Sequence, residues 1–211
     1  MRLIGMLDSP YVRRVAIAAQ LLEIPFEHDP LSVFSTYEQF RRINPVAKAP
    51  TFIADDGTVL MDSGLIIDYL EAVAGRSLLP ADLASRTRAL RVTGLAMAAC
   101  DKIVQIVYEH AVRPPEKRHE PWLARVQEQA LGGLQALDAE IAANPPAVAS
   151  MAGLSAAITW RFMQIKLAAP IPDAACPALA SFAADAERLA VFANTPPLET
   201  ANVSTAGYRA P

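Results

Sequence analysis

The spacing of apolar and polar positions divides the chain into two regimes, and the first of them predicts an α/β unit. Short apolar runs of strand length alternate there with segments that carry apolar residues at helical spacing. In chain order, the predicted elements are a strand over 2–7, a helix over 8–24, a strand over 26–29, a helix over 34–45, a hairpin over 51–63 and a helix over 64–74. The predicted order is therefore β-α-β-α-β-β-α.

Polar residues at the predicted helix starts support two of these helices. Ser9 stands in an N-cap position and Pro10 in the first helical position of the first helix, where both residue types are favoured. Ser35 and Glu38 are three residues apart at the start of the second helix, and this spacing predicts a capping box. Both helices are thus predicted to begin at a side-chain cap.

Glycine residues mark the turn of the predicted hairpin and the end of the helix that follows it. Asp56 and Gly57 lie between two short apolar runs, and this pair is typical of a type I′ hairpin turn. Ser63 closes the hairpin and opens the last helix, which Gly75 terminates.

The second regime is predicted to be entirely helical. Residues 77–84 break the periodicity and are interpreted as a linker. Beyond them alanine dominates, and helical windows run over 85–111, 121–143, 150–167 and 176–193, separated by proline-rich stretches. The predicted organisation is an α/β domain over 1–76, a linker over 77–84 and an all-helical domain over 85–211.

Composition narrows the classes of function. The chain has 211 residues, a formal net charge of −3 and two cysteines, and no apolar run reaches the roughly 18 residues that a membrane span needs. The charge leaves no basic surface for nucleic acid, two cysteines make no disulfide framework, and the N-terminal residues lack a signal-peptide pattern. We expect a cytoplasmic protein that acts on a small molecule, with no nucleic-acid or membrane partner.

Motifs along nearly the whole chain resemble those of the cytosolic glutathione S-transferases. They are SPYVRRV, NPVAKAP, the Asp-Ser pair of MDSGLIIDYLE, a Leu-Leu-Pro linker and a closing VFANTPP. The likeness is greatest to small bacterial members that have a serine near the end of the first strand. The resemblance implies a thioredoxin-like N-terminal domain, an all-α C-terminal domain, a two-fold homodimer and a detoxification enzyme that conjugates glutathione to small hydrophobic electrophiles.

Two short segments match the backbone and the γ-glutamyl end of glutathione under this resemblance. It implies a cis Ala49–Pro50 bond, with the N–H and C=O of Ala49 paired to the cysteinyl backbone like an added strand. The alternative is a trans proline that starts an edge strand. Ser63 at a helix N-terminus offers a hydroxyl, free N–H groups and the positive end of the helix dipole to a carboxylate. Asp62 beside it either meets the α-ammonium group or holds the local turn.

Ser9 is the candidate catalytic residue. A free thiol has a pKa of about 8.5 and the thiolate is the nucleophile, so a hydroxyl donor at the N-terminus of the first helix favours the reactive anion. The alternatives are that Ser9 is only an N-cap, or that Tyr11 is the donor. Lys48 is the candidate partner of the glycine carboxylate, and an ordinary solvated lysine is the alternative.

The electrophile is expected to bind between the two domains. Tyr11 from the first domain and Tyr108 and Arg113 from the second are the candidate contacts. Neither Cys100 nor Cys176 occupies the position of the catalytic serine, which argues against a mixed-disulfide mechanism, and both are interpreted as buried packing residues. The three histidines show no metal-ligand spacing, so no metal is predicted.

One helix start departs from the family pattern. The family opens a helix of the second domain with a Ser-x-x-Asp capping box, whereas this chain has Ser150 followed three residues later by Gly153. Gly153 cannot return the second hydrogen bond of the box. This helix start is therefore expected to lose roughly 0.5–2 kcal/mol unless another group substitutes.

Two other functions fit the same motifs. One is a non-catalytic glutathione-transferase-like protein that binds a partner, and the other is a glutathione-dependent peroxidase or dehalogenase. Calorimetry with glutathione separates the first from the enzyme, because a protein without this ligand gives no binding heat. Only substrate profiling separates the second.

Overall fold

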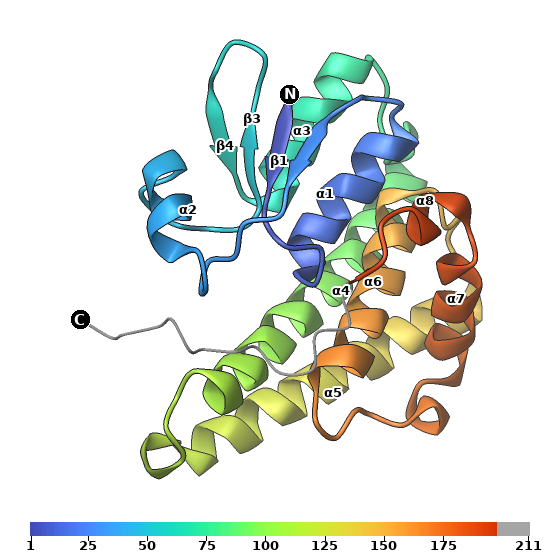
Figure 1. Ribbon diagram of the computed structural model, residues 1–211. Coiled ribbons are helices and arrows are strands. Elements are labelled where there is room, and N and C mark those ends of the chain that lie inside the picture. Colours follow the sequence, from blue (N-terminus) through green and yellow to red (C-terminus); the bar gives the residue numbers. More distant parts are fainter. Residues whose placement is uncertain (198–211) are drawn as a thin grey trace. The chain divides into compact units, whose positions relative to one another are not determined.

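The computed structural model describes residues 1–197 and groups them into two compact units. Unit 1 contains Met1–Leu78 and the described residues from Val191 onward, and unit 2 contains Leu79–Ala190. Strands and helices build unit 1, and helices build unit 2 (Figure 1). The predicted architecture, an α/β thioredoxin-like N-terminal domain with an all-α domain after it, is confirmed.

The division of the chain differs from the predicted one toward its C-terminal end. The predicted helical domain covered 85–211, of which 198–211 lie outside the described residues. Residues 191–197 group with unit 1 rather than with the helices. The physical reason is Arg13 in the first helix of unit 1, whose guanidinium donates to the carbonyls of Phe192 and Thr195.

Unit 1 is built on a mixed four-stranded sheet with the strand order β2-β1-β3-β4. β1 pairs with β2 in parallel and with β3 in antiparallel direction, and β3 pairs antiparallel with β4. The parallel pair requires a crossover connection, which a helix provides. The strands are β1 (Arg2–Ile4), β2 (Glu27–Asp29), β3 (Thr51–Ile53) and β4 (Val59–Met61).

Helices cover both faces of this sheet (Figure 1). They are α1 (Pro10–Leu21), α2 (Tyr37–Ile43) and α3 (Ser63–Ala74). α1 and α3 pack against each other on one face, and on the opposite face Phe40 of α2 is fully buried against Ile4. Leu3 and Phe52, which are partners across the β1–β3 pair, are also fully buried. Burial on both faces fixes the register, because a shift of one residue would exchange the two sets of side chains.

The predicted capping box at the start of α2 is wrong. The N-cap is Thr36, one residue after Ser35, and it makes no side-chain cap hydrogen bond. The Thr36 hydroxyl accepts instead from the N–H of Ser32 at 2.8 Å. Glu38 does not reach back to the helix start, because its carboxylate pairs with Arg41 at 3.0 Å.

β3 and β4 form the predicted hairpin, but the predicted type I′ turn is wrong. Such a turn needs positive φ at both central residues, and of Asp56 and Gly57 only Gly57 has it, at +85°. Five residues, 54–58, link the two strands. The Gly57 N–H donates to the Ala54 carbonyl at 3.0 Å, and the Thr58 N–H donates to the Asp56 carboxylate at 2.9 Å. Because the link is longer than a two-residue turn, Asp56 does not need the positive φ that a type I′ turn would require.

Unit 2 is a bundle of long helices. Its elements are α4 (Leu83–Ala111), η1 (Pro115–Lys117), α5 (Glu120–Ala143), α6 (Met151–Lys166), η2 (Asp173–Ala175) and α7 (Pro177–Glu187), and α8 (Ala190–Ala193) lies at the boundary with unit 1. α6 is buried along most of its length and packs against α4 and α7. Within residues 1–197, none of the helices combines the length and the apolar character that crossing a membrane requires.

Candidate functional site

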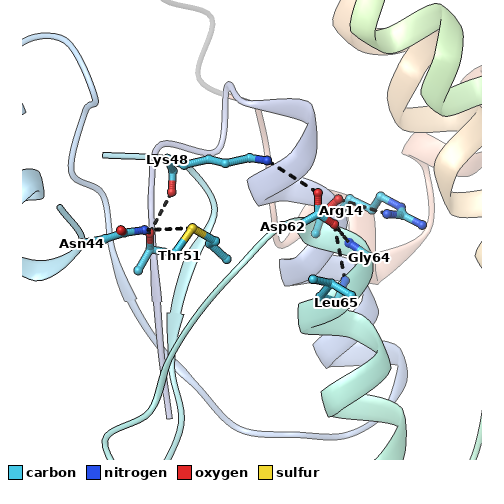
Figure 2. A network of polar contacts seen from close by, with 9 residues as sticks. Arg14, Asn44, Lys48, Thr51, Asp62, Gly64 and Leu65 are labelled. Atoms are coloured by element: carbon cyan, nitrogen blue, oxygen red, sulfur yellow. Dashed lines mark hydrogen bonds and ion pairs between the residues drawn. The ribbon is translucent and has the colours of Figure 1, made fainter. Parts of the chain in front are cut away.

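A buried asparagine shapes the loop that carries three of the predicted site residues, 48–50. Asn44 is fully buried, and its amide Nδ2 donates to the Thr51 hydroxyl at 2.8 Å. That hydroxyl in turn donates to the Lys48 carbonyl at 2.7 Å, and the Asn44 side-chain oxygen accepts from the Val46 N–H at 3.0 Å. Figure 2 shows the contacts of Asn44 with Thr51 and of Thr51 with Lys48. The loop is therefore held at both of its ends.

The Ala49–Pro50 peptide bond is cis, as the family resemblance implied. Ala49 is partly exposed. Within residues 1–197, neither the N–H nor the C=O of Ala49 pairs with another backbone group. An unpaired N–H and C=O next to a sheet can bind an extended peptide in the manner of an added strand.

Gly5 allows the Ala49 loop to approach the first turn of α1. Gly5 has a φ of +138°, which favours glycine. A Cβ at this position would lie 2.6 Å from Val12 Cγ2 and 3.3 Å from the Ala49 Cβ. Ala49 and the start of α1 thus converge at the end of β1. This role of Gly5 was not predicted, although a glycine at a strand end is a signal for close backbone approach.

Ser9 is the N-cap of α1, as predicted. Its hydroxyl oxygen accepts from the Val12 N–H over a long distance of 3.4 Å, and Pro10 occupies the first helical position. Ser9 is partly exposed, and the first turn of the helix contains no acidic residue. The positive end of the helix dipole is therefore not neutralised within that turn. A hydroxyl that accepts one hydrogen bond retains its own hydrogen for donation.

At the start of α3, Asp62 rather than Ser63 is the N-cap. The Asp62 carboxylate accepts from the N–H groups of Gly64 at 2.9 Å and Leu65 at 3.4 Å. Asp62 has a φ of +75°, which is uncommon outside glycine and concentrates at functional sites. Of the two predicted roles of Asp62, the structure shows the one that holds the local turn. Ser63 becomes the first helical residue, and its side chain is buried.

The structure brings Lys48 and Asp62 together. Lys48 Nζ lies 3.6 Å from the second Asp62 carboxylate oxygen, and both side chains are half exposed. From the sequence, these two residues were predicted to contact opposite ends of glutathione. An exposed ion pair of this kind contributes about 0–1 kcal/mol, so a competing carboxylate can displace the lysine from Asp62 at little cost.

Arg14 is a site residue that the sequence analysis missed. Its side chain is buried, with a relative exposure of 5%. Its Nη1 donates to the Ser63 hydroxyl at 3.0 Å, and Figure 2 shows it reaching the first turn of α3 beside Asp62. The sequence did contain a signal for this role, because α1 carries a pair of arginines inside an otherwise apolar stretch. Arginines that simply face solvent would not be expected there.

The three predicted electrophile contacts lie in different units. Tyr11 belongs to α1 in unit 1, whereas Tyr108 and Arg113 belong to unit 2. Tyr108 is 47% exposed, and Arg113 Nε donates to a Glu109 carboxylate oxygen at 2.9 Å. The predicted electrophile site stays a prediction.

Glu109 anchors the segment that follows α4. Its carboxylate accepts from the His119 N–H at 3.1 Å as well as from Arg113. The pKa of Glu109 lies below its usual value, first because of the His119 N–H and then because of Arg113 beside it. A pKa lowered by folding means that ionised Glu109 stabilises the fold above the pKa of the unfolded chain. This contribution is lost as the pH falls through the folded-state pKa.

Glu109→Gln is therefore expected to lower Tm most near neutral pH, with a difference from wild type that shrinks below about pH 4. Thermal unfolding followed by circular dichroism between about pH 7 and pH 3 measures the difference. Glu116→Gln, at an exposed position of the same segment, is the matched control. A Tm difference that stays constant over the whole pH range would contradict the assigned cause.

The two cysteines are buried, as predicted. Burial raises the pKa of Cys176 to about 11, and the neighbouring Asp138 carboxylate adds to the rise. The Cys176 thiol therefore stays protonated at neutral pH and does not act as a nucleophile. In the part of the chain up to residue 197, no group of three or more His, Cys, Asp or Glu side chains has the arrangement that holds a metal ion.

Known proteins show a consistent similarity to this chain. Residues 3–77 match the N-terminal domain of glutathione S-transferases. The uncharacterized GST-like protein YibF of Escherichia coli (strain K12) is 28% identical over 139 residues, 65% of this chain and 68% of that protein. A probable maleylacetoacetate isomerase of Caenorhabditis elegans is 36% identical over 83 residues, only 38% of each protein. A glutathione S-transferase from Methylobacterium radiotolerans, crystallised with glutathione sulfonate, has a TM-score of 0.84 at 27% identity, covering 93% of this chain and 94% of its own.

Proposed function

Because this chain belongs to the glutathione S-transferase family, we propose that it binds glutathione and transfers the glutathione sulfur to a small hydrophobic electrophile. The observation that carries the proposal is that unit 1 offers an unpaired backbone edge at Ala49 together with helix N-termini beside Ser9 and Ser63. An extended tripeptide with a thiol at its centre and carboxylates at its ends needs these kinds of group.

Each part of glutathione has a proposed partner. The cysteinyl backbone pairs with Ala49, next to Pro50. The γ-glutamyl α-carboxylate binds the hydroxyl and N–H of Ser63 at the start of α3. Lys48 turns from Asp62 to the glycine carboxylate, and the freed Asp62 oxygen accepts from the α-ammonium group. The half-exposed, weak Lys48–Asp62 pair supports this exchange.

Ser9 acts on the sulfur. Binding releases the thiol proton to solvent, and the Ser9 hydroxyl donates a hydrogen bond to the resulting thiolate, with the N-terminus of α1 adding its positive potential. The thiolate then forms a carbon–sulfur bond with the electrophile, which either expels a leaving group or takes up a proton. Conjugation therefore consumes one glutathione for each product.

Ser9→Ala is expected to raise the pKa of the bound thiol and to lower the conjugation rate at neutral pH about ten- to a hundredfold, because a hydrogen bond to an anion is lost. Ultraviolet absorbance of the thiolate as a function of pH measures the thiol pKa directly. Tyr11→Phe is the control, since it removes the rival hydroxyl and leaves the helix cap in place. An unchanged thiol pKa in Ser9→Ala, or a larger rise in Tyr11→Phe, would remove Ser9 from the mechanism.

Glutathione-dependent isomerisation is a second candidate reaction. The observation that favours it is the similarity to relatives named as probable maleylacetoacetate isomerases, 36% and 27% identical over part of the chain. In such a reaction the thiolate adds to a double bond, the resulting single bond rotates, and elimination returns the thiol. Counting glutathione thiols before and after turnover separates the two reactions, because isomerisation leaves the total unchanged.

The proposal extends to the electrophile and to the assembly. Tyr11, Tyr108 and Arg113 contact the electrophile, and the active form is a two-fold homodimer in the cytoplasm. Calorimetric titration with glutathione tests the first step, since a purely protein-binding relative gives no heat. Peroxide reduction and dehalogenation are tested by substrate profiling, and sedimentation tests the dimer.

A further inference from the structure

Two adjacent buried arginines on α1 have different partners. Arg13 is 2% exposed and Arg14 is 5% exposed, and a buried guanidinium is costly unless its N–H groups are satisfied. Arg13 donates to the carbonyls of Thr195 and Phe192, so it binds another part of the backbone. Arg14 donates to a side chain, the hydroxyl of Ser63. A buried cation that donates to a hydroxyl beside a predicted ligand site suggests a role in that site.

The contact with Arg14 determines how the Ser63 hydroxyl bonds. A serine hydroxyl has one hydrogen to donate and two lone pairs that accept, whereas a guanidinium only donates. Arg14 therefore occupies a lone pair of the Ser63 oxygen, and the serine hydrogen is directed elsewhere. The neighbouring N–H groups of Gly64 and Leu65 are already bound by the Asp62 carboxylate. In this first turn of α3, Ser63 thus contributes both donors that suit an incoming anion, its hydroxyl and its own N–H.

An anion that binds here meets an electrostatic obstacle. The Asp62 carboxylate lies at the same helix start, and like charges at close range repel each other. Lys48 lies near one carboxylate oxygen of Asp62 and partly compensates its negative charge. Lys48 is half exposed, so solvent screens the lysine charge. Arg14 is buried, so its charge is screened less and acts more strongly on a ligand bound to Ser63.

We propose that Arg14 is a positioning residue that fixes the Ser63 hydroxyl as a donor and makes the site selective for a free α-carboxylate on the γ-glutamyl group. This inference rests on the proposed glutathione binding and specifies which thiols the protein accepts. A γ-glutamyl peptide that has its α-carboxylate binds tightly, and the same peptide without that carboxylate binds more weakly.

Calorimetry with two ligands tests this role. Glutathione is compared with 4-aminobutanoyl-cysteinyl-glycine, which lacks only the α-carboxylate. Wild type is expected to prefer glutathione, and Arg14→Met is expected to reduce that preference about ten- to a hundredfold, through weaker binding of glutathione alone. Arg14→Lys retains the charge and one donor and is expected to restore part of the preference. Arg13→Met is the matched control, an equally buried arginine of the same helix, and is expected to keep the wild-type preference.

The outcomes separate this inference from the proposed function. If wild type binds neither ligand, glutathione binding itself is wrong. If wild type prefers glutathione and folded Arg14→Met retains the full preference, the positioning role is wrong. If Arg14→Met does not fold, the positioning role is tested in wild type by following the nitrogen-15 NMR resonance of Arg14 Nε during titration with each ligand. This resonance is expected to shift with glutathione and not with the decarboxylated peptide, and an equal response to both ligands would overturn the inference.

Discussion

Gly153→Asp is expected to lower the free energy of unfolding by about 3 kcal/mol or more, although it would complete the Ser-x-x-Asp box that the family resemblance leads one to expect. A Cβ on Gly153 would lie 2.2 Å from the Ala147 carbonyl oxygen and 2.7 Å from Val148 Cα. Both are backbone atoms, so relief requires the loop before α6 to move. Any side chain at this position therefore strains the structure.

The Ala147 carbonyl is also the group that replaces the absent aspartate. It accepts from the Ser150 N–H at 3.1 Å, which is the hydrogen bond that the third-position carboxylate of a capping box normally makes. The Ser150 hydroxyl donates to the same carbonyl at 2.6 Å and accepts from the Gly153 N–H at 3.1 Å. The expected loss at this helix start is thus avoided by a backbone substitute that requires glycine.

Urea unfolding of wild type, Gly153→Asp and Gly153→Ala measures the effect. Both variants are expected to be destabilised, with a fall in Tm of about 6–12 °C for a chain of this size. Gly132→Ala is the matched control, because Gly132 is an exposed glycine inside α5 with no atom within 4 Å of an added Cβ. That control is expected to be stabilised by about 0.5–1 kcal/mol. Equal stability of wild type and Gly153→Ala would contradict the close contact.

The sequence predicted whole elements well and single residues less well. Apolar spacing follows from burial, and burial along a helix such as α6 involves many residues that agree with one another. A cap depends on the dihedral angles of one residue. At α3 the positive φ of Asp62 moves the cap one position before Ser63, and at α2 the contact between Ser32 and Thr36 displaces the box expected at Ser35.

The residues of the candidate site also differ in how readily the sequence predicts them. Ser9, Ala49 and Ser63 were proposed from motifs, because local backbone chemistry makes a serine before a helix and a residue before a proline recognisable. Arg14 was missed because its partner lies 49 residues away in the chain. Periodicity shows which face of a helix is apolar, but it does not identify the polar group that a buried charge on that face contacts.

Arg13→Met is expected to lower the free energy of unfolding by about 2–4 kcal/mol and to release the described C-terminal residues from α1. Arg13 Nε donates to the Thr195 carbonyl at 2.8 Å and Nη2 to the Phe192 carbonyl at 3.3 Å, and the guanidinium lies 5.4 Å from the centre of the Phe192 ring. Methionine retains apolar bulk but has no donor. The Thr195 carbonyl then loses its Arg13 donor, while the Phe192 carbonyl keeps the Thr195 N–H beside the Phe192 ring, which is 1% exposed.

Hydrogen exchange distinguishes this local release from general destabilisation. The amide of Thr195, bonded to the Phe192 carbonyl at 3.1 Å, is expected to lose more protection in Arg13→Met than the amides of the sheet. Exchange of the sheet amides becomes faster only by the factor that the loss of global stability sets. Arg41→Met is the matched control, because Arg41 also lies over a ring, Tyr37 at 6.0 Å, but is exposed and, among residues 1–197, forms its ion pair with Glu38 alone. Its expected cost is about 0–1 kcal/mol. If both variants cost the same, burial of Arg13 is not what holds the C-terminal segment on α1.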